Sequence, residues 1–430
     1  MSTRASPSVA VISAAAAAAG VGLGWWLARR GAPAAAPPPS KRDEDDVIAQ
    51  LARPNILKLA PYHCARDDYT EGVLLDANEN AYGATVRCPG DADGYWSCAR
   101  EPDPPPAASA KDEAELNRYP CPYQWELKGL LARYRGVRKN NLFVGVGSDE
   151  AIDLLFRVFC EPRGDACLIT PPTYGMYKVC AAVNDVPVVA VPLTPTFDVD
   201  LDATLAALRA NPNVKLLFLC SPGNPTAKSI PLATVERLLA APEFTGILVL
   251  DEAYADFAAT PSACPLVNTH PRLVVLQTLS KAFGLAGARI GFACGDPRLI
   301  QLLNNIKAPY NLNKLSSALA RRALSPAGIA ALERNVADTL VERTRVAAAL
   351  VAMPFVSHVH PSDTNFLLFA ISPPEKAQPI YKTMAERGVV TRYRGTEKHC
   401  TGCLRVTVGT PKENDALLRL LVQVAAEMGM

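Results

Sequence analysis

The sequence predicts an α/β protein, with a large domain built on a mostly parallel sheet covered by helices and a smaller α+β domain after it. The first observation is that strand-like apolar runs alternate with amphipathic helix-like runs between residues 142 and 278. Nearly continuous apolar strands are typical of parallel sheets covered on both faces. The second observation is a change of pattern at about residue 315, where a helix-rich stretch begins and is followed by two further strand-like runs. At 430 residues, the chain is long enough for two such cores.

The individual elements follow from hydrophobic periodicity and from capping residues. Ser148 opens an amphipathic run that continues to Phe159 and is the expected N-cap of that helix. Other helices are expected at 125–134, 201–209 and 231–239, in 315–353 and at the C-terminus. The expected strands are 142–147, 166–170, 186–191, 214–220, 246–251, 273–278, 364–369 and 403–409.

These elements predict four segments. Residues 1–45 form an N-terminal targeting or anchoring segment with a Pro/Ala linker, and 46–117 form an N-terminal arm with a solvated loop at about 86–112. Residues 118–314 form the large domain and 315–430 the small domain.

Composition and charge favour a globular protein with a small substrate. Hydrophobic residues make up 49% of the chain and charged residues 20%, and the net charge of +2 indicates no nucleic-acid surface. The twelve cysteines are scattered, and several lie in apolar runs, so we interpret them as reduced core thiols. Cys400 and Cys403 are spaced as a pair, but no second pair stands at ligand spacing. We therefore expect no metal site there, and a redox role stays open.

The N-terminal 45 residues carry two hypotheses. Val9–Ala28 is a low-charge run closed by Arg29 and Arg30, and at ~1.5 Å per residue a helix of this length just spans a bilayer core. The run consists mostly of Ala and Gly, so its insertion would be marginal. It is either a presequence directing the protein to an organelle of plastid type or an uncleaved anchor giving membrane association through residues 9–28.

Lys281 is the candidate catalytic residue. It follows the apolar, strand-like run 273–280, and three glycines behind it permit close backbone approach. A lysine amine in apolar surroundings, beside a second cation such as Arg289, loses its proton more readily and can then react with a carbonyl. Pyridoxal phosphate is the aldehyde that suits such a lysine. Ser280 and Arg289 would supply donors for its phosphate.

Three motifs stand in order at the ends of successive strand-like runs. They are Asn224-Pro-Thr, then Asp251 with Tyr254 three residues later, and then Ser280-Lys281. Together they resemble the segments that surround the cofactor in fold-type I pyridoxal-phosphate aminotransferases. The resemblance implies the fold and the cofactor, pyridoxal 5'-phosphate.

A further resemblance lies in the N-terminal arm. Asn78-Glu-Asn-Ala and Arg118-Tyr119-Pro120 are similar to the arm of histidinol-phosphate aminotransferases. Here Ala81 replaces the proline that the family usually has, and 86–112 is an insertion where the family has a short connection. The resemblance runs from about Asp46 to the C-terminus, interrupted by that insertion.

The resemblance implies roles at the cofactor. Lys281 would hold the cofactor covalently and move protons, and Asp251 would bond the pyridine nitrogen. Asn224 and Tyr254 would bond the phenolic oxygen, and Tyr174 would stack on the ring. The catalytic residues would be Lys281, Asp251 and Tyr254. The remaining cofactor-binding residues would be the phosphate cup and a tyrosine from the partner subunit of a homodimer, namely Gly147, Ser148, Asp149, Ser280, Arg289 and Tyr119.

The substrate side is also implied by the resemblance, which points to Arg392, Arg405, Tyr62 and Asn78. Planar guanidinium groups bind phosphate or carboxylate bidentately. The implied reaction is transamination of L-histidinol phosphate with 2-oxoglutarate to give imidazole-acetol phosphate and glutamate, in histidine biosynthesis. Two alternatives share the same scaffold: an aromatic amino-acid aminotransferase and a pyridoxal-phosphate-dependent phospho-amino-acid decarboxylase. A cofactor-binding regulator would carry an appended DNA-binding domain, which residues 1–45 cannot form.

Overall fold

The computed structural model describes residues 52–60, 65–69, 71–86 and 116–430, and Lys58–Met430 form one compact unit. The predicted presequence or anchor and almost all of the predicted insertion lie outside the described residues. Within the described ranges, no helix combines the length and apolarity needed to cross a bilayer.

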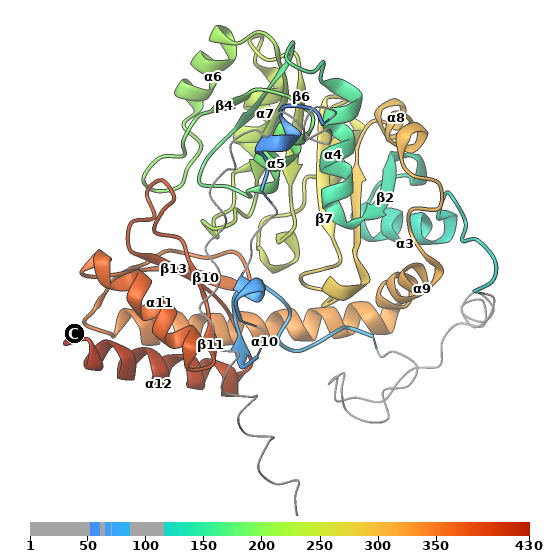
Figure 1. Cartoon of the computed structure of the whole chain (residues 1–430). Coiled ribbons are helices and arrows are strands. Elements are labelled where there is room, and N and C mark those ends of the chain that lie inside the picture. The colour runs from blue at the N-terminus through green and yellow to red at the C-terminus, as the bar shows by residue number, and fades with distance from the viewer. Residues whose placement is uncertain (1–51, 61–64, 70, 87–115) are drawn as a thin grey trace, which may run out of the picture. The chain divides into compact units, whose positions relative to one another are not determined.

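The large sheet has seven strands in the order β2-β8-β7-β6-β5-β3-β4 (Figure 1). Strands β4, β3, β5, β6 and β7 pair in parallel, whereas β8 pairs antiparallel with both β7 and β2. The mostly parallel sheet predicted from the sequence is therefore confirmed. Its strands are β2 (Leu142–Val146), β3 (Ala166–Ile169), β4 (Val188–Ala190), β5 (Val214–Cys220), β6 (Ile247–Asp251), β7 (Leu273–Thr278) and β8 (Ile290–Cys294).

Apolar clusters cover both faces of this sheet. Alternate residues of a strand belong to different clusters: Leu217 belongs to the cluster that includes residues of α3, α6, α7 and α9, and Phe218 to the cluster that includes residues of α4, α5 and α8. This double covering explains why the central strands are apolar at nearly every position. The helices are α3 (Trp125–Arg135), α4 (Gly147–Phe159), α5 (Met176–Val183), α6 (Leu201–Ala210), α7 (Leu232–Ala240), α8 (Pro297–Ile306) and α9 (Lys314–Ala323).

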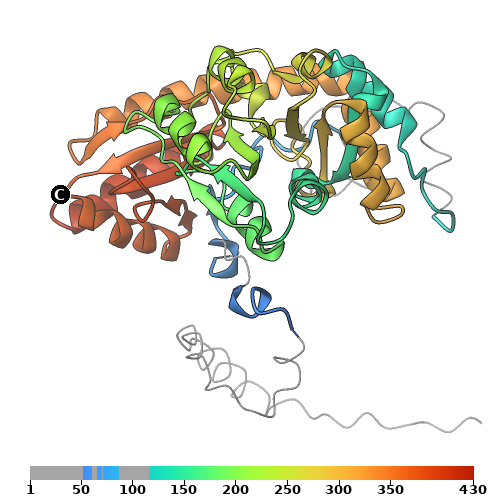
Figure 2. The same ribbon diagram turned by 90° about the horizontal axis from the view of Figure 1, so that it is seen from above.

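The C-terminal part contains a second sheet in the order β12-β13-β10-β9, which packs with α10, α11 and α12 (Figures 1 and 2). Helix α10 contacts α9 as well as β9, β10 and α12, so it runs along both parts of the unit. The elements are α10 (Pro326–Val351), β9 (Val356–Val359), β10 (Phe366–Ile371), α11 (Ala377–Glu386), β12 (Arg392–Tyr393), β13 (Cys403–Thr407) and α12 (Pro411–Glu427). The division at residue 314 stays a prediction.

Residues 71–86 of the N-terminal arm connect the two sheets. Strand β1 (Val73–Leu74) pairs in parallel with β11 (Val389–Val390). Farther along, the Asn78 backbone N–H donates to Thr407 Oγ1 of β13 at 2.9 Å, and Asn80 Nδ2 donates to the carbonyl oxygen of Ala282 at 2.8 Å. The arm thus bonds both to the second sheet and to the loop that carries Lys281.

Two details differ from the sequence-based expectation. Ser148 is not the N-cap of α4: the helix begins at Gly147, its N-cap is Val146, and Ser148 lies in the first turn. The glycine adopts φ of 71°, which lets the chain turn directly from β2 into the helix without a capping side chain. The second difference is β8, a strand that was not expected because its apolar run merges with the glycine-rich segment after Lys281.

We predict that Gly291→Ala destabilises the fold. A Cβ at Gly291 would lie 2.1 Å from the backbone nitrogen of Ser148 and 2.3 Å from the carbonyl carbon of Gly147, so β8 and the β2–α4 turn would have to separate. Overpacking against backbone costs about 1–3 kcal/mol or more. Denaturant unfolding of the cofactor-free protein measures this loss. Gly287→Ala is the control, because no atom lies within 4 Å of its Cβ position; equal stability of the two variants would contradict the prediction.

Candidate active site

A cavity of about 550 Å³ lies where the carboxyl ends of the parallel strands meet the arm and the second sheet. Ligands of open α/β sheets bind in this position because the loops that follow the strands converge there. Of the residues singled out in the sequence, those lining the cavity are Asn78, Ser148, Asp149, Tyr174, Asn224, Asp251, Tyr254, Ser280, Lys281, Arg289, Arg392 and Arg405.

Lys281 follows β7 and extends its amine toward the arm. Its Nζ donates to the carbonyl oxygen of Ala77 at 3.0 Å. The pKa of Lys281 is lowered to about 8, chiefly by burial and then by the positive charges of Arg405 and Arg289, against the opposing carboxylates of Glu79 and Asp149. An amine with this pKa is neutral in an appreciable fraction near neutral pH and can act as a nucleophile.

Asp251 ends β6 and is buried. Its Oδ2 accepts a hydrogen bond from the Tyr177 hydroxyl at 2.6 Å, and its Oδ1 accepts one from the backbone N–H of Ala253 at 3.2 Å. Burial raises the pKa of Asp251 to about 6, while the Tyr177 hydrogen bond acts in the opposite direction. The carboxyl group is therefore mainly ionised at neutral pH and can pair with a cationic N–H.

Two polar side chains that follow strands of the large sheet, Tyr254 after β6 and Asn224 after β5, leave donors for a ligand. Asn78 Nδ2 donates to the Tyr254 hydroxyl oxygen at 3.0 Å, so the Tyr254 hydrogen can be donated elsewhere. Burial raises the pKa of Tyr254 to about 12, which keeps that hydrogen in place at neutral pH. Asn224 Oδ1 accepts from Arg405 Nη1 at 2.6 Å, so the Asn224 amide can likewise donate through its nitrogen.

The turn between β2 and α4 forms a corner with Arg289 whose donors suit an anion. A Cβ at Gly147 would lie 2.8 Å from Arg289 Nη2, so the arginine approaches the turn closely only because this residue is glycine. Arg289 makes long contacts, 3.5 Å from Nη2 to Asp149 Oδ2 and 3.5 Å from Nη1 to Ser280 Oγ. Backbone N–H groups at a helix start together with a guanidinium group favour a phosphate.

Tyr174 lies beside this corner, and its hydroxyl donates to Asp149 Oδ1 at 3.0 Å. Its ring packs edge-on against Tyr177, with ring centroids 5.6 Å apart. Tyr177 meets the Tyr174 ring from one side, and a ring has two faces on which an aromatic ligand can stack.

The remaining sequence-predicted residues lie apart from the cavity. Tyr119 stacks on Tyr310 with centroids 4.5 Å apart and is 79% exposed, so it does not reach the cavity of its own chain. Gly147 contributes through its turn and not as a lining residue. Tyr62 lies outside the described residues.

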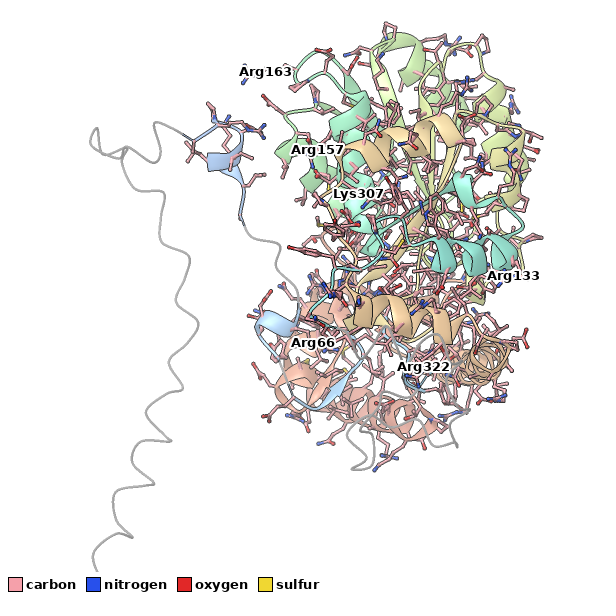
Figure 3. All side chains as sticks on the ribbon, turned by 90° about the vertical axis from the view of Figure 1, so that its right-hand side faces the viewer. Arg66, Arg133, Arg157, Arg163, Lys307 and Arg322 are labelled. Atoms are coloured by element: carbon pink, nitrogen blue, oxygen red, sulfur yellow. The ribbon has the colours of Figure 1, made fainter. Side chains whose placement is uncertain are left out.

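Several cavity residues were missed by the sequence reasoning. Arg66, labelled in Figure 3, comes from the short helix η2 (Ala65–Asp67) and bonds through Nε to Asp76 Oδ1 at 3.0 Å and through Nη2 to Glu79 Oε2 at 2.6 Å. Asp76 and Glu79 line the cavity as well, and so does Arg394. Asp76 lies two residues before the Asn78-Glu-Asn-Ala motif and Glu79 lies within it, which was the signal available in the sequence. No sequence signal indicated Arg66.

The cysteine pair lies elsewhere. Cys400 and Cys403 are both buried free thiols, and the Cys403 N–H donates to the Cys400 carbonyl oxygen at 2.8 Å across a turn. Across the part of the chain that the structure describes, no group of three or more His, Cys, Asp or Glu side chains is arranged to hold a metal ion.

The residues present fit pyridoxal phosphate. The lysine has a lowered pKa, the phosphate corner is shaped by a glycine and an arginine, and Thr173 Oγ1 is a buried cavity atom without a hydrogen-bond partner. An acid stands at the end of β6, and the neutral donors Tyr254 and Asn224 line the same cavity. The fold and these residues together define a pyridoxal-phosphate-dependent enzyme of fold type I.

The comparisons with known proteins agree. The chain belongs to the class I and II aminotransferases, whose sequence profile matches residues 71–421. It is 42% identical over 394 residues to the histidinol-phosphate aminotransferase of Schizosaccharomyces pombe, covering 87% of this chain and 97% of that protein. It is 40% identical to the enzyme of the same name from Saccharomyces cerevisiae, covering 86% and 96% of the two chains. The crystal structure of histidinol-phosphate aminotransferase from Sinorhizobium meliloti with pyridoxal-5'-phosphate superposes with a TM-score of 0.72 at 25% identity, covering 88% of this chain and 98% of that one.

We predict that Lys281→Met stabilises the cofactor-free protein at pH 7. The pKa of Lys281 is about 8 in the folded protein and 10.5 for an exposed lysine. Below pH 8 both states are protonated and the folded state bears the full cost of the buried charge, about 3 kcal/mol. Between pH 8 and 10.5 the unfolded state alone holds the proton, so stability of the parent protein rises with pH and the advantage of the variant shrinks.

Thermal unfolding of both proteins across this pH range measures the effect. Lys412→Met, at an exposed position, is the control and should change little. If Lys281→Met is no more stable than the parent protein at pH 7, burial does not disfavour the protonated amine.

Proposed function

We propose that this chain is a histidinol-phosphate aminotransferase, which exchanges the amino group of L-histidinol phosphate with 2-oxoglutarate and so forms imidazole-acetol phosphate and glutamate. The observation that carries the substrate assignment is Arg405, a buried guanidinium group in the same cavity as the Lys281 amine. The enzymes of that name in the two yeasts, at 40% identity or more over most of the chain, support it.

The cofactor, when bound, supplies an aldehyde carbon and a ring that accepts electrons from the substrate's α-carbon. Lys281 would hold the cofactor, and its Nζ would act as the general base that removes the proton from the substrate carbon. The lowered pKa of Lys281 suits that task, because a base is most useful when it is neutral near the working pH. Asp251 would pair with the pyridine nitrogen, and Tyr254 and Asn224 would donate to the phenolic oxygen.

The substrate phosphate is held by the arginines of the second sheet. Arg392 and Arg405 are register partners on β12 and β13, and Arg394 lies two residues farther along; all three line the cavity. A phosphate offers acceptors for several guanidinium donors at once. The same groups would receive the side-chain carboxylate of glutamate in the second half-reaction. Asn78 lines the same side, and Tyr62, outside the described residues, stays a prediction as a substrate-binding residue.

The site is completed in a homodimer by Tyr119 of a second copy. Tyr119 is 79% exposed and does not line the cavity of its own chain. This position supports a role across an interface. Large apolar side chains around it are also exposed, namely Leu116, Tyr123, Trp125, Tyr310 and Leu315. Residues 116–125 and 310–315 thus present the apolar surface that a dimer would bury.

For residues 1–45, the sequence supports a presequence or an anchor. Both are proposals, because this segment lies outside the described residues.

The phosphate assignment predicts that Arg405→Ala loses preference for phosphorylated substrate. We expect the ratio of kcat/KM for histidinol phosphate to kcat/KM for histidinol to fall about 30- to 1000-fold, the value of a charge-assisted contact. The ratio removes effects common to both substrates, such as the loss of the Arg405 bond to Asn224.

Arg343→Ala is the matched control, since Arg343 Nη1 donates to the Thr364 carbonyl oxygen at 2.8 Å outside the cavity. An unchanged ratio for Arg405→Ala would remove the phosphate role. Phenylalanine outcompeting histidinol phosphate on the parent enzyme would make the aromatic aminotransferase the better assignment.

Mixed dimers test the role of Tyr119. Tyr119→Ala and Lys281→Ala variants should each be weakly active or inactive alone. After the two are unfolded together and refolded, a mixed dimer has one site with Lys281 from one subunit and Tyr119 from the other, so activity should reappear. Refolding each variant separately is the control. No recovery in the mixture, with mixed dimers demonstrated by differential tags, would place Tyr119 outside the partner's site.

A further inference from the structure

Tyr177 is a buried residue that contacts a cavity side chain and has no role in the proposed reaction. It lies in the first turn of α5, is fully buried and does not line the cavity. Its hydroxyl donates to Asp251 Oδ2 at 2.6 Å. Among the described residues it is the one side chain that donates to this carboxylate; the other donor is the backbone N–H of Ala253.

The Tyr177 ring is fixed by aromatic packing. It stacks on Phe218 of β5 with centroids 4.7 Å apart and planes 20° apart, and Phe218 stacks in turn on Phe156 of α4 at 5.4 Å. Tyr174 packs against the Tyr177 ring edge at 85°. The packing therefore fixes the position of the hydroxyl, and the Tyr177 ring contacts Tyr174, the tyrosine proposed to stack on the cofactor.

The hydroxyl can act only as a donor toward Asp251. Burial raises the pKa of Tyr177 well above its usual value, so the group keeps its proton at any physiological pH. A neutral donor at 2.6 Å stabilises the ionised carboxylate over the protonated one, which opposes the effect of burial. The other ionisable groups that interact with this carboxylate are Asp149 of α4, Glu252, Cys220 and Tyr254. These groups are acidic or neutral, so none of them stabilises the ionised carboxylate with a positive charge.

We propose that Tyr177 is a positioning residue that keeps Asp251 ionised and leaves its Oδ1 to pair with the pyridine nitrogen of the cofactor. The inference rests on the proposed function, in which Asp251 takes that place. In a pair of a carboxylate and a pyridine nitrogen, one proton is shared. A donor to the carboxylate lowers its basicity, and the proton then stays on the nitrogen, where it makes the ring electron-accepting.

Tyr177→Phe tests the proposal in the holoenzyme, because it removes the hydroxyl and keeps the ring stack. With ¹⁵N-labelled pyridoxal phosphate bound, the nitrogen resonance should move from the pyridinium position in the parent toward that of neutral pyridine in the variant. We expect kcat to fall about 10- to 100-fold, the worth of a hydrogen bond to a charged group, with KM for the amino donor little changed. The acid limb of the kcat profile should move to higher pH, since a carboxylate that loses a donor has a raised pKa.

Tyr134→Phe is the matched control. The Tyr134 hydroxyl also donates to a carboxylate, Asp256 Oδ1, at 2.8 Å, but neither residue lines the cavity. This variant should leave the nitrogen resonance and the pH profile unchanged. If both variants lower stability and neither moves the resonance, the role of Tyr177 is structural and the proposal fails.

Asp251→Asn separates this inference from the proposed function. If Asp251→Asn leaves the nitrogen resonance in place, the assignment of Asp251 itself is wrong. If Asp251→Asn moves the resonance and Tyr177→Phe does not, the inference about Tyr177 alone is wrong. The double variant should resemble Asp251→Asn, because Tyr177 acts through that carboxylate; independent, additive losses would contradict this.

Discussion

The arrangement of the cavity depends on the hydrogen bonds made by the buried guanidinium group of Arg405. Taking a charge out of water is costly unless acceptors surround it. Arg405 reaches from β13 to two acceptors on other segments, the Asn224 side chain after β5 and the backbone carbonyl oxygen of Asp76 in the arm. Its guanidinium also lies over the Phe366 ring, 5.3 Å from the centroid. One side chain therefore connects the second sheet, the large sheet and the arm.

The same charge acts on the chemistry. Arg405 is the second largest cause of the lowered pKa of Lys281, after burial. The positive potential that would attract a substrate phosphate thus also keeps the reactive amine partly neutral. A phosphate or carboxylate bound beside Arg405 would offset part of that potential and make Lys281 more basic. Substrate binding and the proton affinity of the catalytic base are consequently coupled through a single group.

Much of this architecture was available from the sequence, because the signals were local. Uninterrupted apolar runs gave the parallel strands, and the polar residues that directly follow them, such as Asp251 and Lys281, had to meet at one edge of the sheet. The contacts that the sequence did not reveal join residues far apart in the chain. Arg66 meets Glu79 only because η2 folds back on the arm, and Tyr177 meets Asp251 across 74 positions. Ser148 was mistaken for a cap because the sequence does not show that Gly147, with its positive φ, already begins the helix one residue earlier.

At Lys281 and Asp251, neighbouring side chains modify the effect of burial on the pKa. Burial alone pushes both Lys281 and Asp251 toward their neutral forms. At Lys281 the nearby cations add to that effect and help to lower the pKa to about 8, so a fraction of the amine is neutral near neutral pH. At Asp251 the Tyr177 hydroxyl opposes it, and the carboxyl group stays mainly ionised at neutral pH with a pKa of about 6. Arg405 on β13 acts on the amine and Tyr177 on α5 acts on the carboxylate. The protonation of both groups therefore depends on tertiary contacts around the cavity as well as on the motifs that carry the two residues.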